Sequence, residues 1–464
     1  MRNWLIILVV IALQTGCMSP GLMQPASAAE PELRGTWVTT TANHAISSPE
    51  NTALSMKQLR EIGLNTVYVE VWKNGYTEFP SPTLKAVTGV DMKINPSPDK
   101  PALQRDLLQE TLIEAHRNSL VYIAWFEYGF MAAVKGTSNE LAARQDWLSR
   151  DKNGDVIAKN GFIWLNPLHP DAQDLLIGIV KDAIVKYDID GIQLDDRIVW
   201  PYIDMGYDDF TRNMYKQETG RDAPDDPREP KWVEWRMQKV EAFSKRFVRE
   251  MREAGGPDLI ISLSPGPHPW AMENYLIDWP SWSRWTDNPT WDEYIPQVYR
   301  FAYDRFAKDW REQVEFMGEG NKDLIAGIRL VGEGDDCRED EVAKHAEVTR
   351  ETKSMGHCWW YSRGVLDVFP KLLTEFYDVA NKGHAPHPKR PADWRPAPVV
   401  AKKHADGHWH TTAPTAGTYR LIVKANDSWS QQGTVTLDAG QSWSTDLEGV
   451  DAAELLIQRR KLAD

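Results

Sequence analysis

Cysteine is scarce in this chain, with three residues in 464, at positions 17, 337 and 358. Cys337 and Cys358 alone lie beyond the N-terminal segment, and two cysteines do not make a disulfide framework. We expect both to be free or buried thiols. His44, His169 and His268 fall in separate predicted loops without the spacing of a zinc site. The sequence therefore predicts no metal and no cofactor.

The chain also has no block of positive charge. Its formal net charge is −14 at pH 7, which argues against nucleic acid as a partner. It contains no glycine-rich dinucleotide fingerprint, phosphate loop or nucleophile elbow. Aromatic residues, in contrast, are abundant. The 21 tryptophans fill a core or, where exposed, stack on sugar rings.

The apolar run near the N-terminus, Leu5 to Leu13, is too short to anchor the chain stably in a bilayer. Arg2 precedes it, and Ala26-Ser-Ala-Ala29 is typical of a signal-peptidase site. We therefore predict a signal peptide over residues 1–29 and an exported protein, periplasmic or extracellular. Thr15-Gly-Cys17 resembles a bacterial lipobox with Gln14 in place of the usual leucine. A lipid anchor at Cys17 is the alternative to soluble export.

From residue 33, short apolar segments alternate with helical patterns, as in βαβ units of a parallel sheet. Eight such strands with intervening helices predict a TIM barrel over residues 30–384. An open doubly wound sheet is the alternative, although its glycine fingerprint is absent. The predicted strands are 33–39, 66–72, 121–126, 191–195, 259–264, 294–299, 324–330 and 357–362, and the helices are 52–63, 105–118, 171–187, 231–254, 303–317, 340–354 and 366–380.

Composition changes after the barrel region. Residues 385–400 are rich in proline and predict an extended linker. Short strand patterns with Gly, Asn and Asp turns follow, so residues 401–464 are expected to form a small all-β, sandwich-like domain. Trp409, Trp429 and Trp443 could stack on sugars, but core packing is the expected role of at least two of them.

Carboxylates gather where predicted strands end. Glu70 ends the second strand, Glu127 follows the third, and Asp195 and Asp196 end the fourth. The carboxyl ends of barrel strands share one face, which is where barrel enzymes carry out their chemistry. Adjacent strand residues point in opposite directions, so we expect one aspartate to face the central cavity and the other to brace a loop.

Cleavage of a glycosidic bond needs two carboxyl groups. We predict Asp196 as nucleophile or base, Asp195 as its electrostatic partner and Glu127 as the acid, because its aromatic neighbours would raise its pKa. The alternative is that Glu127 binds a backbone group or an arginine, and that the two aspartates are a structural pair. The fifth strand ends in Ser-Pro-Gly-Pro and carries no carboxylate, where many barrel glycosidases place an acid.

Other polar and aromatic side chains at strand ends suit the recognition of sugar hydroxyls and rings. For each of the polar ones, a structural hydrogen bond is an equally good interpretation. These substrate-binding candidates are Arg34, Glu70, Trp72, Trp125, Asn166, Gln297, Tyr299, Trp360 and Arg363.

Several segments together resemble the family 10 glycosyl hydrolase-like proteins, the former domain of unknown function 187, over residues 30–380. The segments are Leu33-Arg-Gly-Thr-Trp-Val-Thr39, Asn65-Thr-Val-Tyr-Val-Glu-Val-Trp72, Ala124-Trp-Phe126, Trp164-Leu-Asn-Pro167, Tyr187-Asp-Ile-Asp-Gly-Ile-Gln-Leu-Asp-Asp196 and Pro296-Gln-Val-Tyr299. The resemblance implies a TIM barrel and an exported bacterial protein that acts on polysaccharide. The best-understood relatives act on peptide-free peptidoglycan glycan strands.

Carried over by motif, Asp195 and Asp196 match the paired aspartates of the family, Arg34 its Arg-Gly-x-Trp, and Gln297 its Pro-Gln-x-Tyr. The sequence also departs from the family. Glu70-Val-Trp72 replaces a Gln-Val-Arg-like run, Arg197 stands where an aromatic residue is common, and Trp200-Pro201 replaces Tyr-Pro. These positions would line the cleft, so the substrate could differ from peptidoglycan.

The main hypothesis is an exported glycoside hydrolase acting on peptidoglycan glycan strands or an environmental polysaccharide. A glycan-binding protein without activity is one alternative, motivated by the missing carboxylate on the fifth strand. A transglycosylase is the other, with the same residues and a sugar acceptor in place of water.

Overall fold

The computed structural model describes residues 29–96, 104–197, 200–426 and 428–462. The predicted signal peptide, apart from Ala29, and the predicted lipid-anchor residue Cys17 lie outside these residues. Within them, no helix is both long enough and apolar enough to cross a bilayer.

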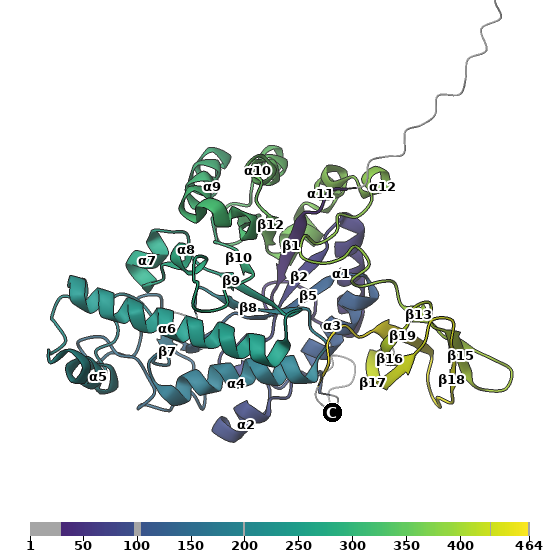
Figure 1. Cartoon of the computed structure of the whole chain (residues 1–464), viewed down its shortest axis with the longest axis horizontal. Helices are drawn as coiled ribbons and strands as arrows, with labels where there is room; N and C mark the ends of the chain where they lie inside the picture. The colour runs from purple at the N-terminus through teal and green to yellow at the C-terminus, as the bar shows by residue number, and fades with distance from the viewer. Residues whose placement is uncertain (1–28, 97–103, 198–199, 427, 463–464) are drawn as a thin grey trace, which may run out of the picture.

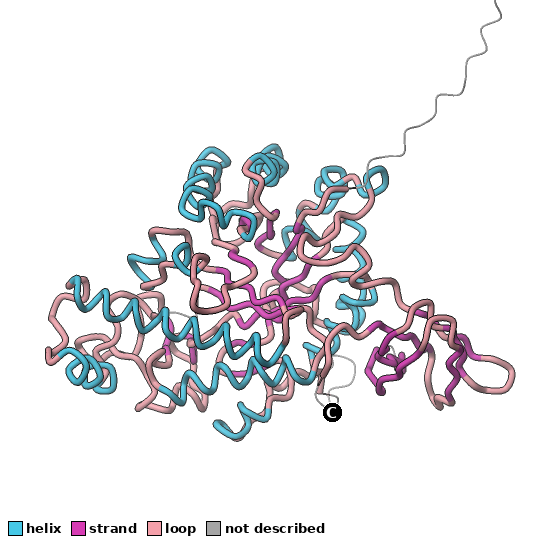
Figure 2. The backbone as a smooth tube through the Cα atoms, viewed as in Figure 1, coloured by secondary structure: helices cyan, strands magenta, loops and turns pink. Residues whose placement is uncertain are grey.

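Eight parallel strands form the centre of the molecule, with helices around them (Figures 1 and 2). They are β1 (Leu33–Val38), β2 (Thr66–Glu70), β5 (Val121–Phe126), β8 (Gly191–Asp195), β9 (Ile260–Ser264), β10 (Glu293–Tyr294), β11 (Ile325–Arg329) and β12 (Gly356–Trp360). Their order in the sheet is β10-β9-β8-β5-β2-β1-β12-β11. Parallel bridges from Tyr294 to Leu324 and from Gln297 to Gly327 join the two edge strands. The predicted TIM barrel is confirmed.

Helices cover the outside of the barrel. The first helix shows why they begin where they do: Pro49 lies in its first turn, and the side chain of Ser48 accepts a hydrogen bond from the Asn51 N–H. The barrel helices are α1 (Pro49–Ile62), α3 (Leu107–Arg117), α4 (Pro170–Lys186), α6 (Pro230–Gly255), α9 (Tyr303–Met317), α10 (Glu339–Glu351) and α11 (Pro370–Tyr377).

Two predicted elements differ from the structure, and proline explains both. The predicted strand 294–299 is regular only at Glu293–Tyr294, because Pro296 has no N–H for a ladder. The predicted helix 366–380 is wrong as a single helix. It is divided into a π-helical turn (Gly364–Val368), α11 and α12 (Val379–Lys382). The π-helical turn ends before Pro370, because proline has no N–H with which to continue it. α11 ends at Asp378, which adopts a positive φ of 50°.

The long connections after β2, β5, β8 and β9 carry additional elements at the carboxyl end of the barrel. They are β3 (Trp72–Lys73), β4 (Tyr76–Thr77), α2 (Pro82–Thr88), β6 (Met131–Val134), β7 (Phe162–Trp164), α5 (Asp209–Thr219), α7 (Trp270–Tyr275) and α8 (Trp279–Trp282). A short 3-10 helix, Gly318–Asp323, follows α9.

The barrel interior contains a buried hydrogen-bond chain as well as apolar side chains. The Trp37 indole donates to Gln193 Oε1 at 2.7 Å, and Gln193 Nε2 donates to Ser262 Oγ at 3.0 Å. Cys337 and Cys358 are buried free thiols, as expected.

The C-terminal region is all-β, as predicted. A four-stranded antiparallel sheet has the order β13-β19-β16-β17, and a three-stranded sheet has the order β14-β15-β18. Trp409 is buried and Trp443 is partly buried between them, so core packing is confirmed for both. The strands are β13 (Val399–Val400), β14 (Lys402–Lys403), β15 (Trp409–Thr412), β16 (Gly417–Ala425), β17 (Ser428–Leu437), β18 (Ser442–Thr445) and β19 (Ala452–Ile457).

This β region lies beside α3 (Figure 1). Ile113 of α3 packs against Ile422 and Leu456, and Arg117 forms an ion pair with Glu454 at 2.8 Å. The proline-rich segment 385–400 also contacts the barrel: Arg395 bonds to Asp188 and Asp190, just before β8. The predicted limits of the linker and of the two domains stay predictions.

Candidate active site

Carboxylates from three neighbouring strands meet at the carboxyl end of the barrel, and two cations connect them. Lys73 Nζ lies 2.6 Å from Glu70 and 3.4 Å from Glu127. Arg197 Nη1 lies 2.8 Å from Glu127 Oε1 and 3.7 Å from Asp195 Oδ2, and its Nε lies 3.6 Å from Asp196 Oδ1. The acidic residues predicted from strand ends therefore form one connected group.

Asp195 points into the protein. It is 3% exposed and accepts hydrogen bonds from the Trp125 indole at 3.1 Å, from Gln297 Nε2 and from the Asp196 backbone N–H at 2.6 Å. Burial, and then the negative charge of Asp196, raises the pKa of Asp195 well above its usual value, against the pull of Arg197. Asp195 is therefore harder to ionise than an ordinary aspartate, and its contact with Asp196 is the hydrogen bond that it accepts from the Asp196 backbone N–H.

Asp196 points the other way, as the alternation along a strand requires. Its side chain is 20% exposed and lines a pocket of about 540 Å³, and its Oδ1 has no hydrogen-bond partner. The expectation that one aspartate of the doublet faces the cavity is confirmed. Asp196 is that residue, and its catalytic role stays a prediction.

The expectation that aromatic surroundings raise the pKa of Glu127 is wrong. Burial does act in that direction, but Arg197, Glu70 and Lys73 together lower the pKa of Glu127 to about 2. The structure agrees with the alternative stated from the sequence, because Glu127 forms an ion pair with Arg197. Glu127 is therefore a carboxylate at neutral pH.

Glu70 is fully buried, so it has no surface with which to contact a substrate. Its Oε2 accepts hydrogen bonds from the N–H and the hydroxyl of Thr40, both at 2.6 Å. Burial, and then the charge of Glu127, raises the pKa of Glu70 to about 8. Lys73 acts against this shift, with its Nζ 2.6 Å from Glu70 Oε1, and the same cation lies 3.4 Å from Glu127 and so connects the two carboxyl groups.

Three predicted substrate contacts are structural instead. Trp72 and Trp125 are fully buried, and their indoles donate to Gly129 O at 3.0 Å and to Asp195. Asn166 is buried and satisfied, because its amide donates to Asp208 and Thr211, each at 2.8 Å.

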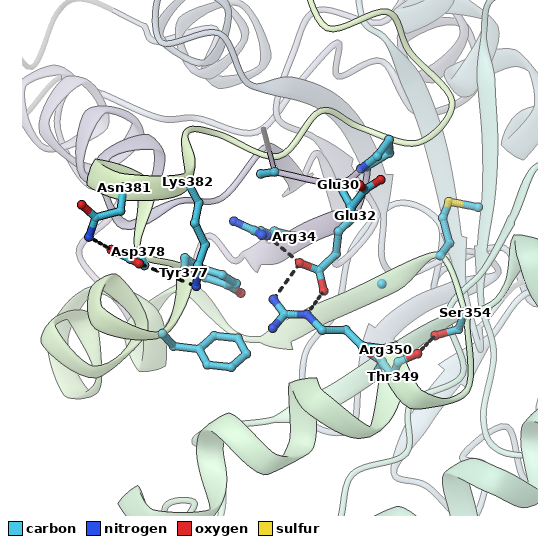
Figure 3. Close-up of a pocket in the computed structure, with 15 residues that line it drawn as sticks. Glu30, Glu32, Arg34, Thr349, Arg350, Ser354, Tyr377, Asp378, Asn381 and Lys382 are labelled. Atoms are coloured by element: carbon cyan, nitrogen blue, oxygen red, sulfur yellow. Dashed lines mark hydrogen bonds and ion pairs between the residues drawn. The ribbon is translucent and has the colours of Figure 1, made fainter. Parts of the chain in front are cut away.

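Arg34 lies at the opposite end of the barrel, since it is the second residue of β1 and strands enter at the amino end. Figure 3 shows it in a pocket of about 620 Å³ with Glu32, Arg350 and Tyr377. Arg34 Nε bonds to Glu32 at 2.7 Å, and its guanidinium lies 4.6 Å from the Tyr377 ring centre. Arg34 is therefore remote from Asp196, and the expectation that it binds the same substrate is wrong.

Gln297, Tyr299 and Trp360 do lie at the carboxyl end, and all three are partly exposed. Gln297 bonds to Asp195 and lines the pocket beside Asp196. The Tyr299 ring stacks on Trp360 with ring centres 5.6 Å apart, and its hydroxyl has no hydrogen-bond partner. Arg363 follows β12, with its guanidinium 3.6 Å from Asp336.

The pocket also contains residues that the sequence interpretation did not select. Its walls include His268 and Trp270 from the connection after β9, and Arg300, Arg305 and Asp309 after β10. The signal in the sequence was the irregular stretch rich in Trp and Pro at residues 267–290. Among the described residues, no group of three or more His, Cys, Asp or Glu side chains is arranged to hold a metal ion.

A model of the glycosyl hydrolase-like 10 family matches residues 32–328, more than half of the chain. The chain belongs to this family. Glycosyl hydrolase DigH of Escherichia coli O6:H1 strain CFT073 is 25% identical over 324 residues, which cover 61% of this chain and 70% of that protein. The same values hold for DigH of Escherichia coli strain K12.

Two solved structures share the fold. The glycoside hydrolase domain of PgaB (BpsB) from Bordetella bronchiseptica has a TM-score of 0.54 and 13% identity, and the match covers 76% of this chain and 99% of that domain. Alpha-L-fucosidase isoenzyme 2 from Paenibacillus thiaminolyticus has a TM-score of 0.52 and 17% identity, and the match covers 75% of this chain and 49% of that enzyme. The barrel is thus one that glycoside hydrolases use.

Proposed function

We propose that this protein is a glycoside hydrolase that cleaves a glycosidic bond in a polysaccharide, with Asp196 as nucleophile or base. The observation that supports this most strongly is the aspartate doublet: Asp196 opens onto the pocket, and buried Asp195 lies behind it with a raised pKa. Asp195 accepts a hydrogen bond from the Asp196 backbone N–H at 2.6 Å, and this contact holds the residue whose carboxylate faces the pocket. The raised pKa of Asp195 also limits the negative charge that builds up behind Asp196.

The leaving oxygen also needs a proton. We propose that it comes from the Glu70–Glu127 pair, with Glu127 as the group that transfers it and Glu70 as the group that stores it. Glu127 is 8% exposed and Glu70 is fully buried, so only Glu127 can reach a substrate. Transfer to the leaving oxygen leaves Glu127 as a carboxylate, which Lys73 and Arg197 stabilise, and the pair regains its proton from solvent before the next cycle. This keeps Glu127 as the acid and adds Glu70 as its proton source.

One observation favours the alternative that the protein binds glycans without cleaving them. Glu127 is ionised at neutral pH, and β9 ends at Ser264 with no carboxylate that could replace it. A barrel with no group able to donate a proton would keep its pocket and lose its activity.

The test is release of new reducing ends from peptide-free peptidoglycan glycan strands, laminarin and xylan. Wild type is compared with Asp196→Asn and Glu127→Gln. Release by wild type that is abolished in Asp196→Asn supports the proposal. An aryl glycoside with a good leaving group needs no acid, so it should restore turnover in Glu127→Gln and not in Asp196→Asn. Binding without release by wild type on every polymer would favour the alternative.

We also propose that the protein acts outside the cytoplasm, in the periplasm or the medium. The charged and apolar pattern of residues 1–29 supports this. Fractionation of cells that express the full chain, with N-terminal sequencing of the product, tests the proposal. An intact Met1 in the cytoplasmic fraction would contradict it.

A further inference from the structure

Trp270 differs from the other described tryptophans because it alone is exposed, with 45% of its surface accessible. It is the first residue of α7 and lies in the wall of the same pocket as Asp196. An exposed indole does not contribute the favourable free energy that burial of its apolar surface would give to folding. Its position beside a candidate catalytic carboxylate indicates a binding role.

The loop that carries Trp270 is held firmly. The side-chain amide of Gln313 pairs with both backbone groups of His268, accepting from its N–H at 2.7 Å and donating to its carbonyl at 3.0 Å. The Trp279 indole donates to Gly266 O at 3.1 Å. A Cβ at Gly266 would lie 3.2 Å from the Trp270 ring, so the indole rests closely on that glycine. The ring is therefore in place before a ligand binds.

Two further aromatic rings pack in sequence behind Trp270. The Tyr275 ring lies edge-on to Trp270 with centres 5.2 Å apart, and Tyr202 lies 5.7 Å beyond it. Tyr275 is buried, and its hydroxyl accepts a hydrogen bond from the Asn160 side-chain amide at 3.2 Å. It therefore supports the Trp270 ring from the protein side.

The pocket lining also carries charged side chains of both signs, with four carboxylates and two guanidiniums. Arg300 and Arg305 both bond to one oxygen of Asp309, at 2.5 Å and 3.0 Å. Because the carboxylates of the lining outnumber its guanidiniums, the pocket has no excess positive charge for an anionic sugar. A flat apolar ring face in a pocket with polar and charged side chains suits an uncharged pyranose, which presents C–H groups to the indole and hydroxyls to the arginines.

We propose that Trp270 is the stacking platform for an uncharged pyranose ring, in a subsite next to the sugar at Asp196. The polymer recognised is then bound through at least two of its sugars. This inference rests on the proposed function, and it adds a residue that determines the length of substrate recognised.

The test measures binding and cleavage separately. Binding to peptide-free peptidoglycan glycan strands, laminarin and xylan is measured by isothermal titration in the Asp196→Asn background, which does not require turnover. The variants are Trp270→Ala, Trp270→Phe and, as a matched control in the same connection, Trp285→Ala. Trp285 is partly buried against Trp282 and does not line the pocket. Thermal unfolding of each variant identifies any that fails to fold.

We expect Trp270→Ala to weaken binding of the recognised polymer about tenfold, with Trp270→Phe retaining most of the affinity. The control should bind as the parent does. In the active protein, Trp270→Ala should raise KM for the polymer and leave kcat within about twofold, since stacking is uniform binding.

Unchanged affinity in a folded Trp270→Ala variant would overturn the platform and leave the proposed function standing. Equal losses in Trp270→Ala and Trp285→Ala would also overturn it, because the effect would then belong to the whole connection. Failure of the parent to bind any of the three polymers would overturn both proposals together.

Discussion

Replacing Arg395 by methionine should destabilise the whole protein, because this side chain joins the C-terminal region to the barrel. Its side chain is 2% exposed. Its guanidinium bonds to Asp188 Oδ2 at 2.8 Å and to Asp190 Oδ1 at 2.7 Å, and it donates to the carbonyls of Ile457 at 3.1 Å and Asp188 at 3.0 Å. Methionine keeps the packing volume and removes every one of these bonds.

The size of the effect follows from what remains. Asp188 and Asp190 are both fully buried, so Arg395→Met leaves two carboxylates that have lost their main cation. Breaking a buried ion pair by removing one partner costs about 3–5 kcal/mol. Arg420 and His116 still face these aspartates, and they keep the loss toward the lower end of that range.

Urea unfolding followed by tryptophan fluorescence measures the effect. The control is Arg338→Met, which removes an exposed pair with Asp340 and should leave the urea midpoint unchanged. The triple replacement Asp188→Asn, Asp190→Asn and Arg395→Met should recover part of the loss, because it also removes the stranded charges. A midpoint for Arg395→Met equal to that of the control would refute the reasoning, since the pair would then be solvated.

Two further predictions concern charge. Wild-type stability should fall as pH is lowered from 6.5 to 4.5. Burial, followed by Arg395, lowers the pKa of His116 to about 4, so the unfolded chain binds a proton in this window and the folded protein does not. Thermal unfolding across the window should show a smaller slope in His116→Gln, and an equal slope would contradict this. Arg197→Met should shift the basic limb of the pH–activity profile about one unit upward, because Glu127, the proposed acid, loses its nearest cation and keeps its proton to higher pH. Arg197→Lys should restore most of the shift, and an unmoved limb would show that Arg197 does not influence the reacting groups.

The barrel was predictable because its strands carry a local signal. Apolar segments of strand length between helical patterns identify β2, β5 and β8 without knowledge of their neighbours. The limits of prediction also have local causes. Pro296 shortens β10, and Pro370 divides a helix, where the hydrophobic pattern continues through both positions.

The location of the site could be predicted from the sequence, but the pKa values of its carboxyl groups could not. Strand ends located Glu127 and the aspartate doublet correctly, because the carboxyl ends of parallel strands share one face. The pKa of Glu127 depends on Lys73 and Arg197, which lie 54 and 70 residues away in sequence. Arg34 was misplaced because it lies near the start of β1, and the starts of parallel strands are at the amino end of the barrel, away from Asp196.

The most direct test of the central claim is turnover by Asp196→Asn beside wild type, measured as new reducing ends on the same glycan at the same protein concentration. The account predicts release by wild type and a loss of at least about a thousandfold in the variant, with unchanged folding and glycan binding. Equal turnover by the two proteins would contradict the account, because the carboxylate that opens onto the pocket would then take no part in bond cleavage.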